Sequence, residues 1–472
     1  MKLFKKPRIL TLLLATFILI GSQGLWAQPA TINGNLLTIP AVTLGNETLE
    51  IVLEIQQGTD PLQLRFVESK LVLAAGFTDL AIFDGSNLEI PQVLVGGVRY
   101  RVNLTVLTAE TLVLQDVVLL SSEDQSPSCQ RPEPDPSHGP NNPQLNSDGF
   151  LVPPSEILDG GAGFDGIPAI SDPRFNHPST QTELLDGDMV VGVKIGDQVR
   201  AYPHRILDWH EVVNDRFVVE GASESYSITY CPLTGSAMLW KGAMGVVDPT
   251  FGVTSLLYNS NQVLFDRESL SIWSQMLEQS IGGPQALAIP ERLQVVETSW
   301  ETWKEMYPNS FVMTTDTGFT RDYLESPYEG YNTSSRTLFP AANLDSRLHP
   351  KARVLGINVG DASKVYPIRS FGFGVSVIND TVGELDVVAV ASLGKNLGVI
   401  FNRQLEDCTT LDFSPVQDQL PIVMIDNEGS AWDVFGNAVS GPRAGTALAK
   451  TNSYIAYWFA WSAFFPGAEM HQ

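Results

Sequence analysis

The chain has 472 residues, and its 53 acidic side chains outnumber 29 basic ones, giving a net charge of −24. A surface this acidic repels nucleic acid and anionic lipid, which excludes both as expected partners. The length suffices for about three domains, and three cysteines (Cys129, Cys231 and Cys408) are too few for a small disulfide-rich scaffold. One bridge at most can form, so one thiol is left over.

The N-terminus has the pattern of a secretory signal peptide. The basic start MKLFKKPR precedes a short apolar run, and SQGLWAQPA supplies small residues for a cut after Ala27. The apolar run is shorter than the roughly 20 residues that span a bilayer, although an uncleaved N-terminal anchor stays open as the alternative. Removal of residues 1–27 takes away Lys2, Lys5, Lys6 and Arg8, which changes the net charge from −24 to −28. We therefore expect an exported protein, periplasmic or extracellular, with no stable membrane span.

Two composition changes follow along the chain. In residues 28–120, runs such as TLEIVLEI and RYRVNLTVL alternate apolar and polar side chains, with Gly, Asn and Asp between them. This period of two predicts a small β-sandwich-like domain of antiparallel strands. Residues 121–148 are rich in Pro, Ser and Asn and cannot bury enough apolar surface to fold, so they are predicted to be a linker.

The remainder repeats itself. VGVKIGDQVRAYPHRILDWHEVVND in the first part parallels LGINVGDASKVYPIRSFGFGVSVIND in the second. Further pairs follow in the same order: Asp266 with Asp426, Trp273 with Trp432, Trp303 with Trp461. We predict a duplicated β-rich α+β module, with a first copy at 149–345 and a second at 346–472 that pack as a pseudo-symmetric pair. The fold class is then mainly β with some α.

Residues present in only one copy are candidates for chemistry. The first copy has His204, His210 and Glu211, together with the segment YCPLTGSA around Cys231. The second copy has Ile368, Gly374 and Val375 at the first three positions, and ASLGKNLG without a cysteine. The first copy is therefore predicted to carry the active site, and the second to be a degenerate partner. The alternative is that the second copy drifted around a fold that never had a site.

Cys231 lies between two strand-like runs in SITYCPLTGSAMLW. We predict a strand, a tight turn over residues 231–235 and a second strand. Backbone N–H groups in such a turn point at the sulfur and stabilise the thiolate, so we expect a pKa below the value of about 8.5 for a free thiol. A buried, inert thiol is the alternative.

The histidines are the predicted companions of this thiol. His204 and His210 are six residues apart, which places them on one face of an extended segment but on different faces of a helix. Glu211 beside His210 would fix the tautomer of the imidazole. The predicted catalytic set is Cys231, His210, Thr234 and Glu211. The predicted metal ligands are Cys231, His210 and His204, with copper or zinc as the metal.

The motifs VRAYPHRILDWHEVVND, ITYCPLTGSAMLW, FGVTSLLYNSNQVLFDRESLSIWSQM and GGP together resemble the bacterial family called domain of unknown function 3179. The resemblance covers about residues 180–315. The turn resembles the Cys-Pro-x-Cys-Gly of many members, and some members look like selenoproteins there, which implies redox chemistry. This chain has Thr234 at the second cysteine position, which puts a two-thiol mechanism in doubt.

Two functions remain open from the sequence. The first is a thiol-dependent redox or metal-binding role centred on Cys231; as an enzyme the protein would be a monothiol oxidoreductase, unless Cys408 resolves the thiol, acting on an unknown small molecule or redox partner. The second is a non-catalytic periplasmic binding or scaffold module with a ligand cleft between the two copies. For a bound ligand, the predicted contacts are Tyr258, Asn259, Asp266 and Arg267.

Overall fold

The computed structural model describes most of the chain as two compact units, residues 1–128 and 129–472. The described residues are 30–33, 36–44, 47–56, 63–71, 81–83, 86–95, 98–108, 111–119, 145–181, 183–219, 221–243 and 250–471. The predicted signal peptide (1–27) and most of the predicted linker (121–148) lie outside them. Strands dominate both units, so the predicted β-rich fold with some α is confirmed. Among the described residues, no helix is both long and apolar enough to cross a membrane.

The first unit is a single eight-stranded sheet that closes on itself. Its strands are β1 (Ala30–Asn33), β2 (Leu36–Leu44), β3 (Glu47–Gln56), β4 (Gln63–Leu71), β5 (Ala81–Phe83), β6 (Asn87–Val95), β7 (Val98–Val106) and β8 (Thr111–Leu119). The order is β1-β2-β3-β4-β8-β7-β6-β5, and parallel pairings β1–β6 and β2–β5 close it. Bulges in β2 and β6 surround Pro40 and Pro91, which have no N–H to donate to a ladder. β2 pairs with β1, β3 and β5, and β6 pairs with β1, β5 and β7.

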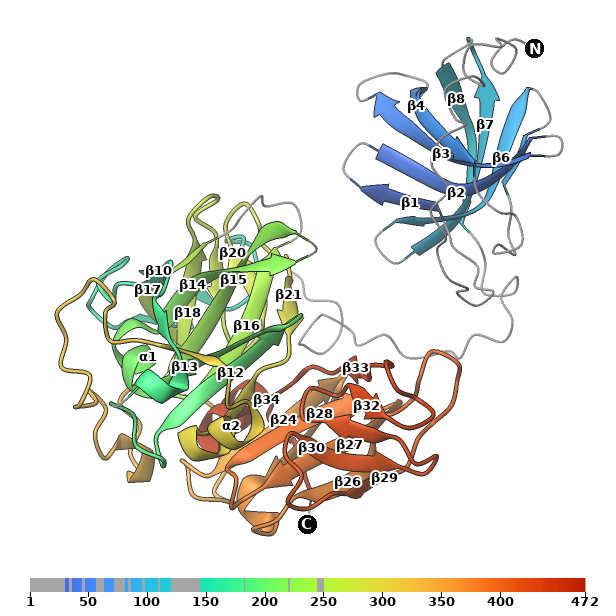
Figure 1. Cartoon of the computed structure of the whole chain (residues 1–472). Helices are drawn as coiled ribbons and strands as arrows, with labels where there is room; N and C mark the ends of the chain where they lie inside the picture. The colour runs from blue at the N-terminus through green and yellow to red at the C-terminus, as the bar shows by residue number, and fades with distance from the viewer. Residues whose placement is uncertain are drawn as a thin grey trace. The chain divides into compact units, whose positions relative to one another are not determined.

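The first half of the second unit (residues 149–345) holds three five-stranded sheets (Figure 1). One has the order β10 (Ile170–Ser171), β14 (Val212–Val219), β15 (Ala222–Cys231), β16 (Ser236–Ala243), β21 (Pro290–Leu293). Another has the order β11 (Phe175–Asn176), β23 (Phe311–Met313), β13 (Gln198–Pro203), β12 (Met189–Ile195), β22 (Val296–Ser299). The third has the order β20 (Gln279–Gly282), β19 (Ile272–Ser274), β18 (Asn261–Asp266), β17 (Phe251–Tyr258), β9 (Ile157–Asp159). The helices are α1 (His204–His210), α2 (Trp300–Met306) and the 3₁₀ turns η3 (Pro154–Glu156), η4 (Pro178–Thr180) and η5 (Tyr331–Thr333).

The second half (residues 346–472) holds three four-stranded sheets. One has the order β34 (Ser453–Tyr457), β24 (Arg353–Val359), β25 (Ala362–Pro367), β35 (Glu469–Met470). Another has the order β26 (Ser376–Val382), β27 (Leu385–Ser392), β28 (Leu397–Asn402), β33 (Ala449–Lys450). The third has the order β29 (Phe413–Pro415), β30 (Ile422–Asp426), β31 (Ala431–Asp433), β32 (Ala438–Ser440). The helices are η6 (Ile368–Ser370) and α3 (Trp458–Phe464).

The two halves contain matching buried hydrogen bonds. Tyr202 donates to Asp215 over 2.5 Å in the first half, and Tyr366 donates to Asp380 over 2.7 Å in the second. Trp273 donates to Asp266 in the first half, and Trp432 donates to Asp426 in the second. The side chain of Asn214 bonds the backbone of Phe251, and that of Asn379 bonds the backbone of Phe413 in the same way. A duplicated module would keep such bonds in both copies. The paired motifs therefore have the same packing role in both halves, and the duplication itself stays a prediction.

The two halves also share hydrophobic cores. Trp303 of α2 lies on Gly192, where an added Cβ would be 1.9 Å from the ring; Trp461 of α3 lies on Gly356, where the corresponding distance is 2.4 Å. Trp303 belongs to a core that includes Phe401 of the second half, and Trp461 belongs to a core that includes Trp240 and Trp273 of the first half. Each half therefore buries a tryptophan in a core shared with the other.

Candidate active site

Cys231 ends β15, and a tight turn leads directly to β16, as predicted. The carbonyl of Cys231 accepts bonds from the N–H of Gly235 (2.8 Å) and of Thr234 (3.3 Å). Gly235 has a φ of +59°, which glycine adopts readily. A Cβ there would be 2.8 Å from the ring of Tyr457, the last residue of β34 in the second half. The N–H of Tyr457 donates to the carbonyl of Thr234 (2.7 Å), so the second half closes this turn.

The thiol of Cys231 is free and almost completely buried, at 1% exposure. The N–H groups of Gln262 and Thr234 and the Thr234 side chain hydrogen-bond to it, as the predicted donor-rich turn requires. Burial, followed by the charge of Glu211, nevertheless raises the pKa of Cys231 to about 11. The expectation of a lowered pKa is therefore wrong, because the cost of desolvating the thiolate outweighs the donors.

No second thiol is placed to resolve Cys231 within the described residues. Cys408 is disulfide-bonded, whereas Cys231 is free, so the two do not pair. Thr234 is fully buried, and its hydroxyl bonds Ser236 (2.9 Å) and the Asn261 amide (2.9 Å). Thr234 therefore holds the turn in place and donates to the sulfur.

The segment after Pro203 forms a helix, α1, and this decides which side chains lie together. Positions 204, 208 and 211 have the i, i+4, i+7 spacing that places His204, Asp208 and Glu211 on one helix face. His210 is six residues from His204 and lies on a different face. Glu211 ends the helix in the left-handed region, with a φ of +59°, and its N–H donates to Leu207 (2.7 Å).

His210 binds structural partners with both ring nitrogens. Its Nδ1 lies 2.7 Å from the carbonyl of Pro168, and its Nε2 lies 2.7 Å from the hydroxyl of Tyr323. The carbonyl can only accept, so Nδ1 carries the proton and Nε2 accepts from Tyr323. With both nitrogens occupied, His210 has none left for Cys231 or a metal. Its predicted roles as catalytic partner and as ligand are therefore wrong.

The protonation of His210 gives a testable pH dependence. Burial, followed by the charge of Arg321, lowers the pKa of His210 below its usual value. A base with a lowered folded-state pKa contributes stability that is complete above about pH 6.5 and is lost as the pH falls through the lowered pKa. We expect urea unfolding to show a larger loss of stability between pH 7.5 and pH 5.5 in the wild type than in His210→Gln. An equal loss in both proteins would contradict this role.

His204 contacts two residues of its own half. Its Nε2 lies 3.2 Å from Glu297 Oε2, and its ring packs on Tyr230 at 4.2 Å between centroids. Arg353 of the second half approaches the same carboxylate at 3.7 Å. Across the residues that the structure describes, no three His, Cys, Asp or Glu side chains are grouped to hold a metal ion. The predicted ligand set of Cys231, His210 and His204 is not brought together.

Glu211 is the titratable neighbour of Cys231. It is buried at 5% exposure, and its Oε1 accepts from the hydroxyl of Tyr328 at 3.4 Å. Burial, with a further contribution from the negative charge of Asp208, raises the pKa of Glu211 to about 8. Glu211 was predicted as a member of the catalytic set that orients His210; in the structure its carbonyl accepts from the N–H of Tyr230 (2.8 Å), the residue before Cys231, and its negative charge raises the pKa of the thiol.

A cover segment, residues 317–331, lies over α1 and the Cys231 turn. Its contacts are Tyr323 to His210 (2.7 Å), Ser326 to Asp208 (2.6 Å), Glu325 O to Trp209 (3.1 Å), Tyr328 to Glu211 (3.4 Å) and Tyr331 to Leu233 O (3.1 Å). Between this segment and α1 is a cavity of about 510 Å³. Its lining includes Pro168, Asp208, Trp209, Arg321, Asp322 and Tyr328. Tyr328 thus links the cavity to Glu211.

The predicted ligand contacts are occupied by the protein itself. Asp266 accepts from Trp273 (3.0 Å) and Ser269, the contact that recurs at Asp426, and this identifies a structural role. Arg267 forms a two-bond ion pair with Asp165 (2.6 Å each). Tyr258 packs on Phe464, and Asn259 accepts from the Ala342 N–H (2.9 Å). These four side chains serve packing and turns.

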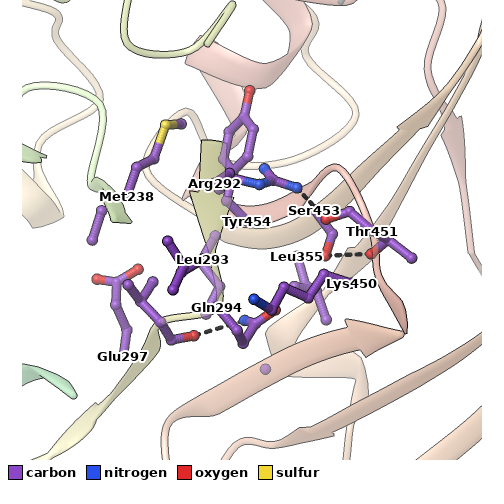
Figure 2. Close-up of a pocket in the computed structure, with 14 residues that line it drawn as sticks. Met238, Arg292, Leu293, Gln294, Glu297, Leu355, Lys450, Thr451, Ser453 and Tyr454 are labelled. Atoms are coloured by element: carbon purple, nitrogen blue, oxygen red, sulfur yellow. Dashed lines mark hydrogen bonds between the residues drawn. The ribbon is translucent and has the colours of Figure 1, made fainter. Parts of the chain in front are cut away.

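A second cavity lies between the two halves (Figure 2). Met238 and Arg292 line it from the first half, and Lys450 and Tyr454 from the second. Its volume of about 20 Å³ accommodates a water molecule but not a larger ligand. This junction gives no support to a ligand cleft between the copies.

A family model described as protein of unknown function (DUF3179) matches residues 164–468. The chain belongs to this family. The DUF3179 match includes both halves of the second unit and so extends well beyond the resemblance at 180–315. No curated protein and no solved structure matches the chain.

Two residues of the DUF3179 site were missed from the sequence, Asp208 and Tyr328. A signal existed for Asp208, because reading HRILDWHE as a helix places it between His204 and Glu211 on one face. Tyr328 had no such signal, since it lies in an irregular segment more than 90 residues after Cys231.

Proposed function

We propose that the protein is an exported, thiol-dependent redox protein in which Cys231 reacts with a small molecule and Glu211 accepts its proton. One observation carries the proposal: Cys231 is a buried free thiol, and the buried Glu211 is hydrogen-bonded both to Tyr230, the residue before Cys231 (2.8 Å), and to Tyr328, which lines a cavity of about 510 Å³. Perturbed titratable groups gathered at a cavity are typical of catalytic sites. We do not propose a metal-binding role, because both ring nitrogens of His210 are hydrogen-bonded, one to Pro168 and the other to Tyr323.

The proposed step begins with ionised Glu211. The Sγ–H bond of Cys231 breaks, the proton moves to the Glu211 carboxylate, and the sulfur electron pair attacks an electrophilic atom of the oxidant. The bond between that atom and its leaving group breaks, and the leaving group departs with the electron pair. Cys231 is oxidised by two electrons, and the oxidant is reduced. A thiol with a raised pKa is a strong nucleophile once deprotonated, and a nearby base supplies the deprotonation.

Export rests on the N-terminal sequence, with support from Cys408. Disulfides persist mainly in oxidising compartments, and Cys408 is disulfide-bonded. Such a compartment would also supply oxidants to a protein with a free thiol.

The test is the pH profile of Cys231 alkylation by iodoacetamide, followed by mass spectrometry of its peptide. In the wild type the rate should rise with an inflection near pH 8, where Glu211 ionises. Glu211→Gln should lose this inflection and react about 100-fold more slowly at pH 8.5, the usual scale of general base catalysis.

The variant His210→Gln tests whether His210 or Glu211 accepts the proton of Cys231. The alkylation profile of His210→Gln should retain the inflection near pH 8. Circular dichroism checks that each variant is folded. Identical profiles for wild type and Glu211→Gln would overturn the role of Glu211. A wild-type thiol that remains unlabelled until urea unfolds the protein would identify Cys231 as a packing residue.

A further inference from the structure

We propose that the carboxamide of Gln262 is the substrate-binding group beside Cys231, and that the small molecule it binds is uncharged and carries a hydrogen-bond acceptor next to a donor, as an amide does. This inference rests on the proposed function and names the class of its small molecule. Glu211 keeps its task on the sulfur, and Gln262 holds the molecule that the sulfur attacks.

Gln262 lies next to the sulfur because of its place in β18. Its backbone N–H is one of the groups that hydrogen-bond to the Cys231 sulfur. In the ladder Gln262 is paired with Leu257 of β17, and along β18 it shares a face with Leu264. Both leucines pack in the same hydrophobic core as Cys231. The side chain of Gln262 therefore enters the core that contains the thiol.

The carboxamide of Gln262 has unused hydrogen-bonding capacity. Gln262 is 1% exposed, and in the part of the chain that the structure describes neither its Oε1 nor its Nε2 takes part in a hydrogen bond. A carboxamide can donate two hydrogen bonds and accept two. Buried polar groups without partners are costly and rare in proteins. This one indicates that the core receives a molecule with hydrogen-bonding groups.

The adjacent Gln275 provides the contrast within the same chain. Its backbone N–H donates to the carbonyl of Gln262 (3.4 Å), and its side chain is also fully buried. Its Nε2 donates to Thr229 (3.0 Å) and to the Ser236 carbonyl (3.1 Å), and its Oε1 accepts from Ser236 (2.8 Å) and Asn261 (2.7 Å). Of these two neighbouring glutamines, Gln262 is the one that can bind a further molecule.

The surroundings decide the charge of the bound molecule. Cys231 and Gln262 are both 1% exposed, so a charged molecule would lose its hydration there and need a counter-charge. A carboxamide offers none, and the negative charge of Glu211, which raises the pKa of Cys231, would repel an anion. An uncharged molecule has no such cost. Its acceptor can bond Nε2 of Gln262 and its donor can bond Oε1, which orients it.

Two alkylating reagents with the same leaving group test the binding role. Iodoacetamide carries an amide, methyl iodide has no hydrogen-bonding group, and both expel iodide. In Gln262→Met, alkylation of Cys231 by iodoacetamide should fall about 10-fold, the effect of losing two hydrogen bonds between neutral groups. Alkylation by methyl iodide should change less than about 3-fold, because methionine fills nearly the same volume as glutamine. Mass spectrometry of the Cys231 peptide measures both rates.

Iodoacetate tests the charge of the molecule in the wild type. Folded protein should prefer iodoacetamide to iodoacetate at Cys231 at least about 10-fold more strongly than the urea-unfolded chain does, the factor expected from a repelled charge. An equal preference in folded and unfolded protein would contradict the uncharged class.

Urea denaturation separates binding from packing. Gln262→Met removes an unpaired buried amide, so the midpoint should stay the same or rise, whereas Gln275→Met, the matched control, removes a bonded amide and should lower it. A lowered midpoint in Gln262→Met, an equal fall of both alkylation rates, or no fall with iodoacetamide would overturn the inference and leave the role of Glu211 intact. A wild-type thiol that is inert to both reagents until the chain unfolds would overturn the proposed function itself.

Discussion

Replacing Trp303 by alanine is expected to destabilise the second unit by about 3–5 kcal/mol, as for other fully buried aromatic residues. The side chain has no exposed surface, and its indole N–H donates to Ser310 (3.0 Å). Its ring fills the space left by Gly192, in a core that also contains Phe401 of the second half. The alanine variant would leave a cavity at that shared core. The loss in the free energy of unfolding is measured by urea denaturation monitored by far-UV circular dichroism, which reports on the backbone.

Trp461→Ala provides the comparison within the same chain. Trp461 is equally buried, lies on Gly356 and donates to Ser363 (3.1 Å). A loss of similar size is expected from it. A loss below about 1 kcal/mol at Trp303 would contradict the role of this residue in a core shared by the halves.

Arg292→Met is expected to cost about 3–5 kcal/mol, because it removes one partner of a buried ion pair. Arg292 contacts Glu278 over 2.6 Å, and Glu278 is only 3% exposed. The same guanidinium donates to the carbonyl of Thr451, so it also ties the first half to the second (Figure 2). Without it, a buried carboxylate loses its counter-charge. Chemical denaturation at pH 7 measures the effect.

The double variant Arg292→Met with Glu278→Gln tests the cause of that loss. Removing the second charge should recover a large part of the stability, since no uncompensated carboxylate then remains. Losses that add fully in the double variant would show that packing of the arginine, and not its charge, stabilises the junction.

The β-rich fold could be predicted because apolar and polar side chains alternate in residues 28–120, and the Cys231 turn because Pro and Gly define it locally. The geometry of His204 and His210 could not. A helix of seven residues is too short to be stable alone, and α1 persists because Ile206 and Leu207 are buried in the surrounding core. Its helical form separates the two histidines and brings Glu211 to the thiol.

The raised pKa of Cys231 could not be predicted from the sequence, for a related reason. Local donors can be inferred from a turn, but burial depends on what lies above it. Here Tyr331 of the cover segment bonds the Leu233 carbonyl, and Tyr457 of the second half lies on Gly235. Both residues are distant in sequence from the turn that they bury.

The contact between Gly235 and Tyr457 has an evolutionary consequence. Because the tyrosine ring occupies the volume of a Cβ at position 235, Gly235 cannot be replaced unless the ring moves or is lost. The half without a thiol supplies that ring, and so the half with the thiol constrains its sequence. We therefore expect the two positions to vary together, and an alignment of relatives should show glycine at 235 wherever an aromatic residue occupies 457.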